Sequence, residues 1–430
     1  MPEDFRDNEI MAYRFRLTYD LLENFFTGVL HMRFDTAPNE MNIIILRGAK
    51  TISPGGEFPE TQQELEEQAG WEQPDIKLVN DVWNRFNDVI ALAWTDAQNN
   101  EHVRAFTGSG DPGQVTRARY LRTVQWLHGY GFVAQGQHTA TWGNVPIQRR
   151  LTYIDIAAYT QEGNRVAAGW GKRLQWVNGE KYYTLAPVLE AQIHGAGPVE
   201  RAGRERFIGD ATAGCTVYCG GAGDQGELYD TIWGWYGMER NTFNVLVWKA
   251  WDLYRWERDE RFNPRDFRPT LDFATRDWSN VPAQRRVEQI QRLLEDRTGV
   301  DIQDDAGVFG NHTGDTLREF QRVCYEFIIL FLQSSEEFRG IDLDNPPNRQ
   351  IELAQHMCGG NWGLDRQYFQ HPGNILTLTI NPRELRWERN EWICGPETWK
   401  LLECPGLFIP LNVPVREDVP NVRTEAWEGN

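Results

Sequence analysis

The chain has 430 residues, 40% of them hydrophobic and 25% charged, which is an ordinary composition for a globular protein with room for two or three domains. Its 62 acidic residues against 44 Lys and Arg give a formal charge of -18, so there is no electrostatic reason to expect nucleic acid or an anionic membrane as a partner. Because no stretch approaches about eighteen uninterrupted apolar residues, we also expect no insertion into a membrane.

Residues 1–40 predict an N-terminal helical extension. The first residues are acidic, whereas a signal peptide needs a basic start and an apolar run, so we expect synthesis in the cytoplasm without a signal peptide. Before the turn-like APNE, apolar residues recur at helical spacing at Phe15, Leu17, Leu21, Leu22, Phe25 and Phe26. We interpret this segment as an extension or docking element outside the first domain.

Residues 41–256 predict a strand-rich domain. Short apolar runs recur there between turn signals, namely MNIIIL, DVIALAW, HVRAFTG, LTYIDIAAY, RLQWV and VLEAQIH. At the end of the domain, NTFNVLVWKAWDLYRW has one helical face made of Phe243, Val247, Ala250, Trp251 and Tyr254. With Asn241 or Thr242 as its N-cap, this run predicts a helix that packs on the sheet.

A histidine and a cysteine in this domain are candidates for nucleophilic catalysis. His194 ends an apolar run of alternating character, so a strand delivers it to an edge of the sheet, and Gly195 allows close approach of a substrate backbone. Gly214 precedes Cys215 and permits the strained turn that exposes a nucleophile and directs backbone N–H groups toward one point. A cysteine and a histidine this far apart are nevertheless unrelated in most proteins, and the residues alone leave both interpretations open.

The same residues resemble the active site of the L,D-transpeptidase family, which carries a His-Gly, a glycine-rich loop and a Ser-His-Gly-Cys motif. The corresponding residues here are His194-Gly195, the loop to Gly209, and Thr212-Ala213-Gly214-Cys215. The domain is more closely similar to transpeptidase-like proteins of phages and their relatives, in which a small residue often replaces the second histidine. Upstream, AFTGSGDPG is similar to the Thr-Gly and Pro-x-Gly turn that builds the substrate cleft of the family.

The resemblance implies a catalytic role for four residues. Cys215 is the expected nucleophile and His194 its general base. The backbone N–H groups of Gly214 and Cys215 are the expected oxyanion donors, and Thr212 is a polar neighbour.

Further positions are expected to contact substrate or depart from the family's pattern. Gly195 and Asp111 are expected to line the cleft, and His138, in a glycine- and aromatic-rich stretch, is a candidate third group near it. Ala213 stands where the family usually has its second histidine. Val217 stands where an arginine commonly follows the cysteine.

The rest of the chain predicts a linker, a second domain and a tail. The linker covers 257–282, which is charged and contains prolines without clean periodicity. The second domain covers 283–405 and contains an insertion at about 334–391, which could enlarge a ligand groove or make a protein contact. Residues 406–430 form the C-terminal tail.

Three helices are expected in the second domain. Apolar stripes in RRVEQIQRLLEDRTG and TLREFQRVCYEF predict the first two, the first ended by Gly299 and the second opened by a capping box from Thr316 to Glu319. CGPETWKLLE predicts a short third helix with Pro396 in its first turn and with Trp399 and Leu402 facing inward.

The series Q-x-L-L, D-x-G-V-F-G-x-x-T, L-x-x-F-Q and C-G-P-E-T-W-K-L-L resembles the small three-helix peptidoglycan-binding domain attached to many cell-wall enzymes. The similarity covers about 283–330 and 392–404, with Cys394 in place of a hydrophobic residue and Ala306 interrupting the usual Asp-Gly. It implies that Phe309 and Trp399 contact the bound wall polymer. A three-helix module kept only as a connector is the alternative.

The cysteines predict neither disulfides nor a metal site. The chain has 6 of them, scattered as Cys215, Cys219, Cys324, Cys358, Cys394 and Cys404, without a pair of CxxC motifs. His356, Cys358 and His371 are only a weak match to a metal site. We therefore expect no metal and no cofactor.

Together these patterns predict an α+β multidomain protein with a strand-rich L,D-transpeptidase-like domain and a small three-helix peptidoglycan-binding-like domain. The expected function is that of a transpeptidase or peptidase that acts on bacterial peptidoglycan through a Cys215 thioester. Such a protein acts at the cell wall or periplasm after lysis or injection, or as part of a virion. The alternative is a structural or cargo component of a phage tail or contractile injection system, with phage or injection-system proteins as partners and an inactive enzyme fold.

Overall fold

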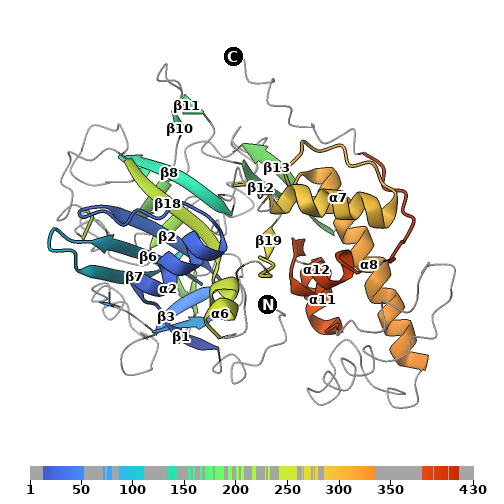
Figure 1. Cartoon of the computed structure of the whole chain (residues 1–430), viewed down its shortest axis with the longest axis horizontal. Coiled ribbons are helices and arrows are strands. Elements are labelled where there is room, and N and C mark those ends of the chain that lie inside the picture. Colours follow the sequence, from blue (N-terminus) through green and yellow to red (C-terminus); the bar gives the residue numbers. More distant parts are fainter. Residues whose placement is uncertain are drawn as a thin grey trace. The chain divides into compact units, whose positions relative to one another are not determined.

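The computed structural model describes residues 13–52, 87–110, 242–258, 285–334, 380–390, 392–404 and 406–415 as longer segments. The shorter described segments are 71–72, 75–79, 133, 135–142, 154–155, 158–159, 165–166, 170–177, 180–187, 192–195, 200–202, 205–207, 216–218, 228, 231–232, 264, 266–272, 275 and 277–278. The chain divides into two compact units between Phe267 and Arg268. It is an α+β protein with a strand-rich core (Figure 1).

The N-terminal unit is built on a sheet of nine described strands. Their order is β17 (Thr216–Tyr218), β14 (Gln192–Gly195), β9 (Ile154–Asp155), β8 (Gly136–Trp142), β18 (Thr242–Lys249), β2 (Met41–Arg47), β6 (Asp88–Thr95), β7 (Glu101–Ser109) and β4 (Trp71–Glu72). The strands from β8 to β7 lie side by side in Figure 1. Because β7 also pairs with β17, the sheet closes on itself.

The interior of the closed sheet is a cluster of buried apolar side chains. Successive side chains point to opposite faces of a strand, so alternate residues of β2, namely Met41, Ile43 and Ile45, enter this cluster. Its other members are Ile90, Leu92, Trp94, Phe106, Val133, Ala140, Ile193, Leu228, Ile232, Phe243, Val245 and Val247. Since every residue of β2 is buried, both faces of the sheet are covered at this strand.

The remaining strands of this unit form smaller sheets. β12 (Trp170–Val177) pairs with β13 (Glu180–Pro187), β10 (Ala158–Tyr159) with β11 (Arg165–Val166), and β15 (Glu200–Ala202) with β16 (Glu205–Phe207). The predicted apolar runs MNIIIL, DVIALAW, HVRAFTG and RLQWV are thus confirmed as strands.

Residues 242–258 are a strand followed by a helix. β18 pairs in parallel with β2 and antiparallel with β8, and α6 (Ala250–Arg258) begins directly after it. The helix predicted from a cap at Asn241 or Thr242 is therefore wrong over β18 and confirmed over α6. Phe243 to Lys249 are all buried, so this strand lacks the apolar-polar alternation that distinguishes a strand from a helical stripe.

The described part of residues 1–40 belongs to the N-terminal unit and is not an extension outside it. β1 (Arg14–Arg16) pairs with β5 (Asp75–Leu78), which pairs with β3 (Ala49–Ile52). Only then does a helix begin, as α2 (Tyr19–Glu23) and the π-helix η1 (Asn24–Val29), because Thr18 Oγ1 accepts the Leu21 N–H. The apolar residues that predicted one long helix pack into the core, with Leu17, Leu22 and Phe25 fully buried.

The C-terminal unit contains α7 (Arg286–Thr298), α8 (Asn311–Ser334), α11 (Pro382–Asn390) and α12 (Pro396–Leu402). The three predicted helices are confirmed as α7, α8 and α12, with Gly299 in the left-handed region (φ 71) after α7 and Pro396 opening α12. A ribbon joins β19 (Leu271–Asp272), from the predicted linker, to β20 (Ile393–Cys394). α11 falls at the end of the predicted insertion, whose residues 335–379 lie outside the described part.

The start of α8 corrects the predicted capping box. The helix begins at Asn311, and Asp304 Oδ2 accepts the Thr313 N–H at 2.6 Å. Thr316 therefore lies inside the helix, where its buried Oγ1 has no hydrogen-bond partner. A Ser/Thr-x-x-Glu pattern carries no information on whether an acid from a preceding loop already caps the helix.

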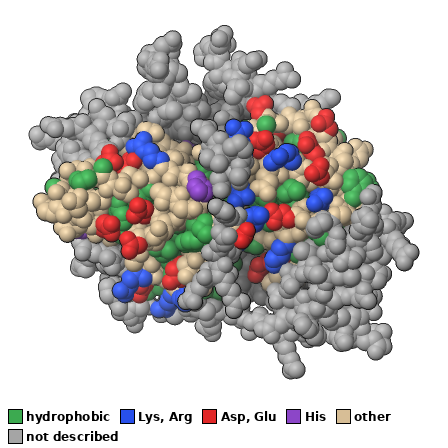
Figure 2. Space-filling model, in the orientation of Figure 1, with side chains coloured by type: hydrophobic (Ala, Val, Ile, Leu, Met, Phe, Trp, Pro, Cys, Tyr) green, Lys and Arg blue, Asp and Glu red, His purple; other side chains and the backbone are tan. Residues whose placement is uncertain are grey.

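Among the described helices, none has the length and apolar character needed to cross a membrane. On the face drawn in Figure 2, acidic and basic side chains of the described residues are interspersed. The charge of -18 is therefore not displayed as one acidic surface on this face.

Candidate functional site

Strand pairing places His194 beside the strand that follows Cys215. β14 and β17 are parallel, with His194 opposite Val217 and Gly195 opposite Tyr218. In the sequence, Cys215 directly precedes β17 and stands two positions before Val217. The predicted site residues that lie outside the described part of the chain are Asp111, Thr212, Gly214 and Cys215.

His194 was predicted to lie at an edge of the sheet. Its strand, β14, lies between two other strands instead. β17 pairs with it on one side and β9 on the other. Ile193, which precedes His194, is fully buried in the interior cluster. The closure of the sheet through β7 gives β17 a second neighbour as well.

The second neighbour of β17 is the end of β7. Val217 lies opposite Ser109, and Tyr218 opposite Gly108, in an antiparallel pairing. Val217 therefore has His194 as its partner on one side and Ser109 on the other. The first part of AFTGSGDPG, predicted to build the substrate cleft, thus lies beside the strand that follows Cys215.

A buried carboxylate that the sequence reasoning did not select holds the end of β7. Asp88, at the start of β6, is fully buried; its Oδ1 accepts the Gly48 N–H at 2.9 Å and its Oδ2 accepts the Gly110 N–H at 2.5 Å. Arg47 is the backbone partner of Asp88 and donates from Nη2 to the Val133 carbonyl at 2.6 Å. The sequence signal that could have identified Asp88 is the acidic residue at the start of the apolar run DVIALAW.

His138 lies on β8, which β9 separates from β14. Its backbone partner is Val245 of β18, and its side chain is partly buried. His138, which was predicted as a third group near the cleft, thus lies two strands away from His194 in the sheet.

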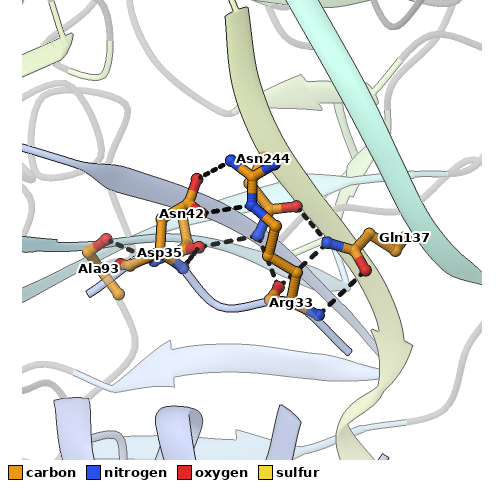
Figure 3. Close-up of polar contacts among 6 residues, drawn as sticks. All are labelled: Arg33, Asp35, Asn42, Ala93, Gln137 and Asn244. Carbon is orange, nitrogen blue, oxygen red and sulfur yellow. Dashed lines mark hydrogen bonds and ion pairs between the residues drawn. The ribbon is translucent and has the colours of Figure 1, made fainter. Parts of the chain in front are cut away.

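A network of amide side chains, also missed from the sequence, fastens residues 33–35 to the sheet (Figure 3). Asn42 accepts the Asp35 N–H and donates to the Asp35 carbonyl, both at 2.8 Å. Asn244 donates to the Arg33 carbonyl at 2.8 Å, and Gln137 accepts the Arg33 N–H at 3.1 Å. These side-chain amides make the hydrogen bonds that the backbone of a neighbouring strand would make. We therefore assign the network to the stability of the fold and not to catalysis.

Phe309 and Trp399, predicted to contact the wall polymer, lie in the core of the C-terminal unit. Phe309 is 0% exposed and Trp399 1% exposed, and the Trp399 Nε1 donates to the Pro269 carbonyl at 2.9 Å. A ligand could not reach either ring in this structure. Both residues therefore serve packing, which corrects their assignment as substrate contacts.

The glutamines of the motif also hold the fold together. Gln321, from L-x-x-F-Q, donates to the Ile393 carbonyl at 2.8 Å and to Thr398 Oγ1 at 2.7 Å. Gln291, from Q-x-L-L, donates to the Val308 carbonyl at 2.9 Å. The residues that carry the resemblance join the loops of this unit to its helices.

An acidic side chain from outside each helix binds the start of α7, α8 and α12. Asp277 accepts the Val287 N–H at 2.8 Å, and Glu388 accepts the N–H groups of Glu397 at 2.9 Å and Thr398 at 2.8 Å. These carboxylates, like that of Asp304 at the start of α8, accept hydrogen bonds from N–H groups that have no partner within the helix. A Cβ at Gly395 would overlap the Glu388 carboxylate, which explains glycine at that position.

Burial changes the pKa of several groups in the C-terminal unit. It is the main cause that raises the pKa of Glu388 to about 8, and the nearby Glu397 adds to the increase. Burial also raises the pKa of the Cys324, Cys394 and Cys404 thiols. Since the thiolate is the nucleophilic form, these three cysteines are poor candidates for a nucleophile.

Within the described segments, no group of three or more His, Cys, Asp or Glu side chains could hold a metal ion. His356, Cys358 and His371 lie outside those segments. Comparisons with models of protein families, with curated proteins and with solved structures found no match to this chain.

Proposed function

We propose that this chain is a peptidoglycan-acting cysteine enzyme with an L,D-transpeptidase-like N-terminal domain and a peptidoglycan-binding-like C-terminal domain. The observation that supports it best is the parallel pairing of β14 with β17, in which His194 lies opposite Val217 and Cys215 precedes β17. Neighbouring strands lie about 5 Å apart, so this register is compatible with a thiol and an imidazole within reach of each other.

In the proposed reaction, His194 takes the proton of the Cys215 thiol, and the thiolate attacks the carbonyl carbon of an amide between an L-centre and a D-centre in a stem peptide. The backbone N–H groups of Gly214 and Cys215 stabilise the oxyanion. The C–N bond then breaks, and the amine leaves with the proton held by His194. An acceptor amine or water attacks the resulting thioester and releases the Cys215 thiol.

A second candidate function is that of a structural component of a phage tail or contractile injection system. It draws support from the C-terminal unit, where Phe309 and Trp399 are buried and motif residues such as Gln321 hold loops. In this alternative the three-helix unit is a connector, and the N-terminal domain is a scaffold.

The deciding experiment is incubation of the purified protein with isolated sacculi from several bacteria, followed by mass analysis of the stem peptides. We expect released or exchanged peptides with the native chain and none with Cys215→Ala or His194→Ala. Cys219→Ala is the matched control, since it removes a neighbouring thiol with no proposed role and should retain activity. Absence of a Cys215-dependent product on every type of sacculus would reject the enzyme and leave the structural candidate.

A further inference from the structure

We propose that Asp88 is a positioning residue for the Cys215–His194 site, an inference that rests on the proposed function. The described contacts of Asp88 are with the backbone of Gly48 and Gly110. Asp88 acts through the backbone at the end of β7, which pairs with the strand that follows Cys215.

The Asp88 carboxylate is buried and fully engaged with backbone donors. Asp88 is 0% exposed, and burying a carboxylate without polar partners would cost several kcal/mol. Its two oxygens are turned to backbone donors of two different turns, Gly48 after β2 and Gly110 after β7. One side chain thus fixes both turns relative to the start of β6.

Gly110 lies in a closely packed, charged environment. A Cβ added there would lie 3.4 Å from Asp88 Oδ2, 3.5 Å from Arg47 Nε and 3.7 Å from Ile45 Cγ2. The charged side chains of Asp88 and Arg47 therefore lie close to the backbone of this one residue. Together with the hydrogen bond from Gly110 to Asp88, this packing holds the backbone at the end of β7.

Backbone pairing connects this turn to the candidate site. Gly110 follows Ser109, and Ser109 lies opposite Val217 in the pairing of β7 with β17. Val217 in turn lies opposite His194 in the pairing of β17 with β14. A shift at Gly110 would thus be transmitted through two backbone ladders to the strand that begins immediately after Cys215.

The test measures thiol reactivity, which does not require a substrate. The rate of Cys215 alkylation by iodoacetamide is followed by peptide mass analysis in the full chain between about pH 5 and pH 9. In the native chain the midpoint should lie below the ordinary thiol pKa of about 8.5, because His194 stabilises the thiolate, and His194→Ala should abolish that shift. Asp88→Asn should raise that midpoint by about one pKa unit, which slows alkylation about tenfold at pH values well below the midpoint.

Asp96→Asn is the matched control at the opposite end of the β6–β7 hairpin. Asp96 Oδ1 also accepts two backbone N–H groups, those of Gln98 and Asn100, both at 2.8 Å. The Asp96 variant should leave the alkylation profile unchanged even if it unfolds at a lower temperature. Asp88→Glu keeps a charged acceptor and should raise the midpoint by only about half a pKa unit, or about a threefold slowing at pH values well below the midpoint. This variant also tests the role of Asp88 if Asp88→Asn fails to fold.

The possible results separate this inference from the proposed function. A perturbed native profile that neither Asp88 variant alters, or that Asp96→Asn alters equally, would overturn the role of Asp88 and leave the enzyme proposal standing. A native Cys215 that titrates as an ordinary thiol, with no effect of His194→Ala, would overturn both.

Discussion

Glu388 is a buried acid whose protonation depends on its position in the C-terminal unit. Its carboxylate receives the N–H groups of Glu397 and Thr398 at the start of α12. Hydrogen bonds from these groups lower its pKa, but burial outweighs them and the pKa rises to about 8. The same residue therefore caps a helix and carries a proton over much of the neutral range.

This pKa predicts how stability depends on pH. Between the ordinary glutamate value of about 4.3 and the folded value of about 8, the folded state binds more protons than the unfolded state, so the free energy of unfolding falls as pH rises. Glu388→Gln should flatten that part of the dependence. The measurement is thermal unfolding of the native chain and the variant between about pH 5 and pH 8, with the α8 surface variant Glu326→Gln as control. Equal slopes for the native chain and Glu388→Gln would contradict the assignment.

At the scale of elements, the amide network shows how a segment without regular structure is fixed to a sheet. Asn42 on β2 and Asn244 on β18 lie on neighbouring strands, and the Asn244 side chain donates to Asn42 Oδ1 at 2.8 Å. Asn42 is fully buried and satisfies both backbone groups of Asp35. Residues 33–35 are thus anchored by side chains where a strand would use its backbone.

We predict that Asn42→Ala destabilises the N-terminal unit by about 2–4 kcal/mol, because two buried backbone groups of Asp35 lose their partners. The check is urea unfolding together with hydrogen exchange of the Asp35 amide, which should become faster. Arg33→Ala is the control: the Arg33 side chain is 68% exposed, so loss of its ion pair with Asp35 should cost no more than about 1 kcal/mol. Equal losses in the two variants would show that the network does not act through the backbone.

At the scale of the whole molecule, the division into units falls inside the predicted linker of 257–282. Phe267, the last residue of the N-terminal unit, is 1% exposed and meets Phe25 edge to face at a centroid distance of 6.0 Å. It also meets Trp256 at 6.2 Å. Four residues later, Leu271 pairs with Cys394 in the C-terminal unit. The charged segment is therefore partly incorporated into both units.

This division predicts a local effect of Phe267→Ala in the full chain. Loss of a buried aromatic ring should destabilise the N-terminal unit by about 3–5 kcal/mol. Hydrogen exchange should become faster in β2 and stay unchanged in α7, and the exposed Val415→Ala should change neither. An equal increase in α7 would place the division elsewhere.

Local periodicity and helix caps were sufficient to predict several elements correctly from the sequence. The stripe of α7 with Gly299 after it, Pro396 at the start of α12, and runs such as MNIIIL predicted real helices and strands, because these signals lie within the element that they describe. His194 was likewise predicted on a strand from alternation alone, and β14 confirms it.

Which segments pair and pack against each other was seen only in the folded chain. The tertiary structure made residues 242–249 a strand, because β2 and β8 pair with them, and it buried Phe309 in the core of the C-terminal unit. The spacing had predicted only that Trp399 faces inward, which its burial confirms. The pairing of β14 with β17 and the bonds of Asp88 to two turns join residues far apart in the sequence. Such contacts depend on which strands pair in the folded sheet, so no local pattern could predict them.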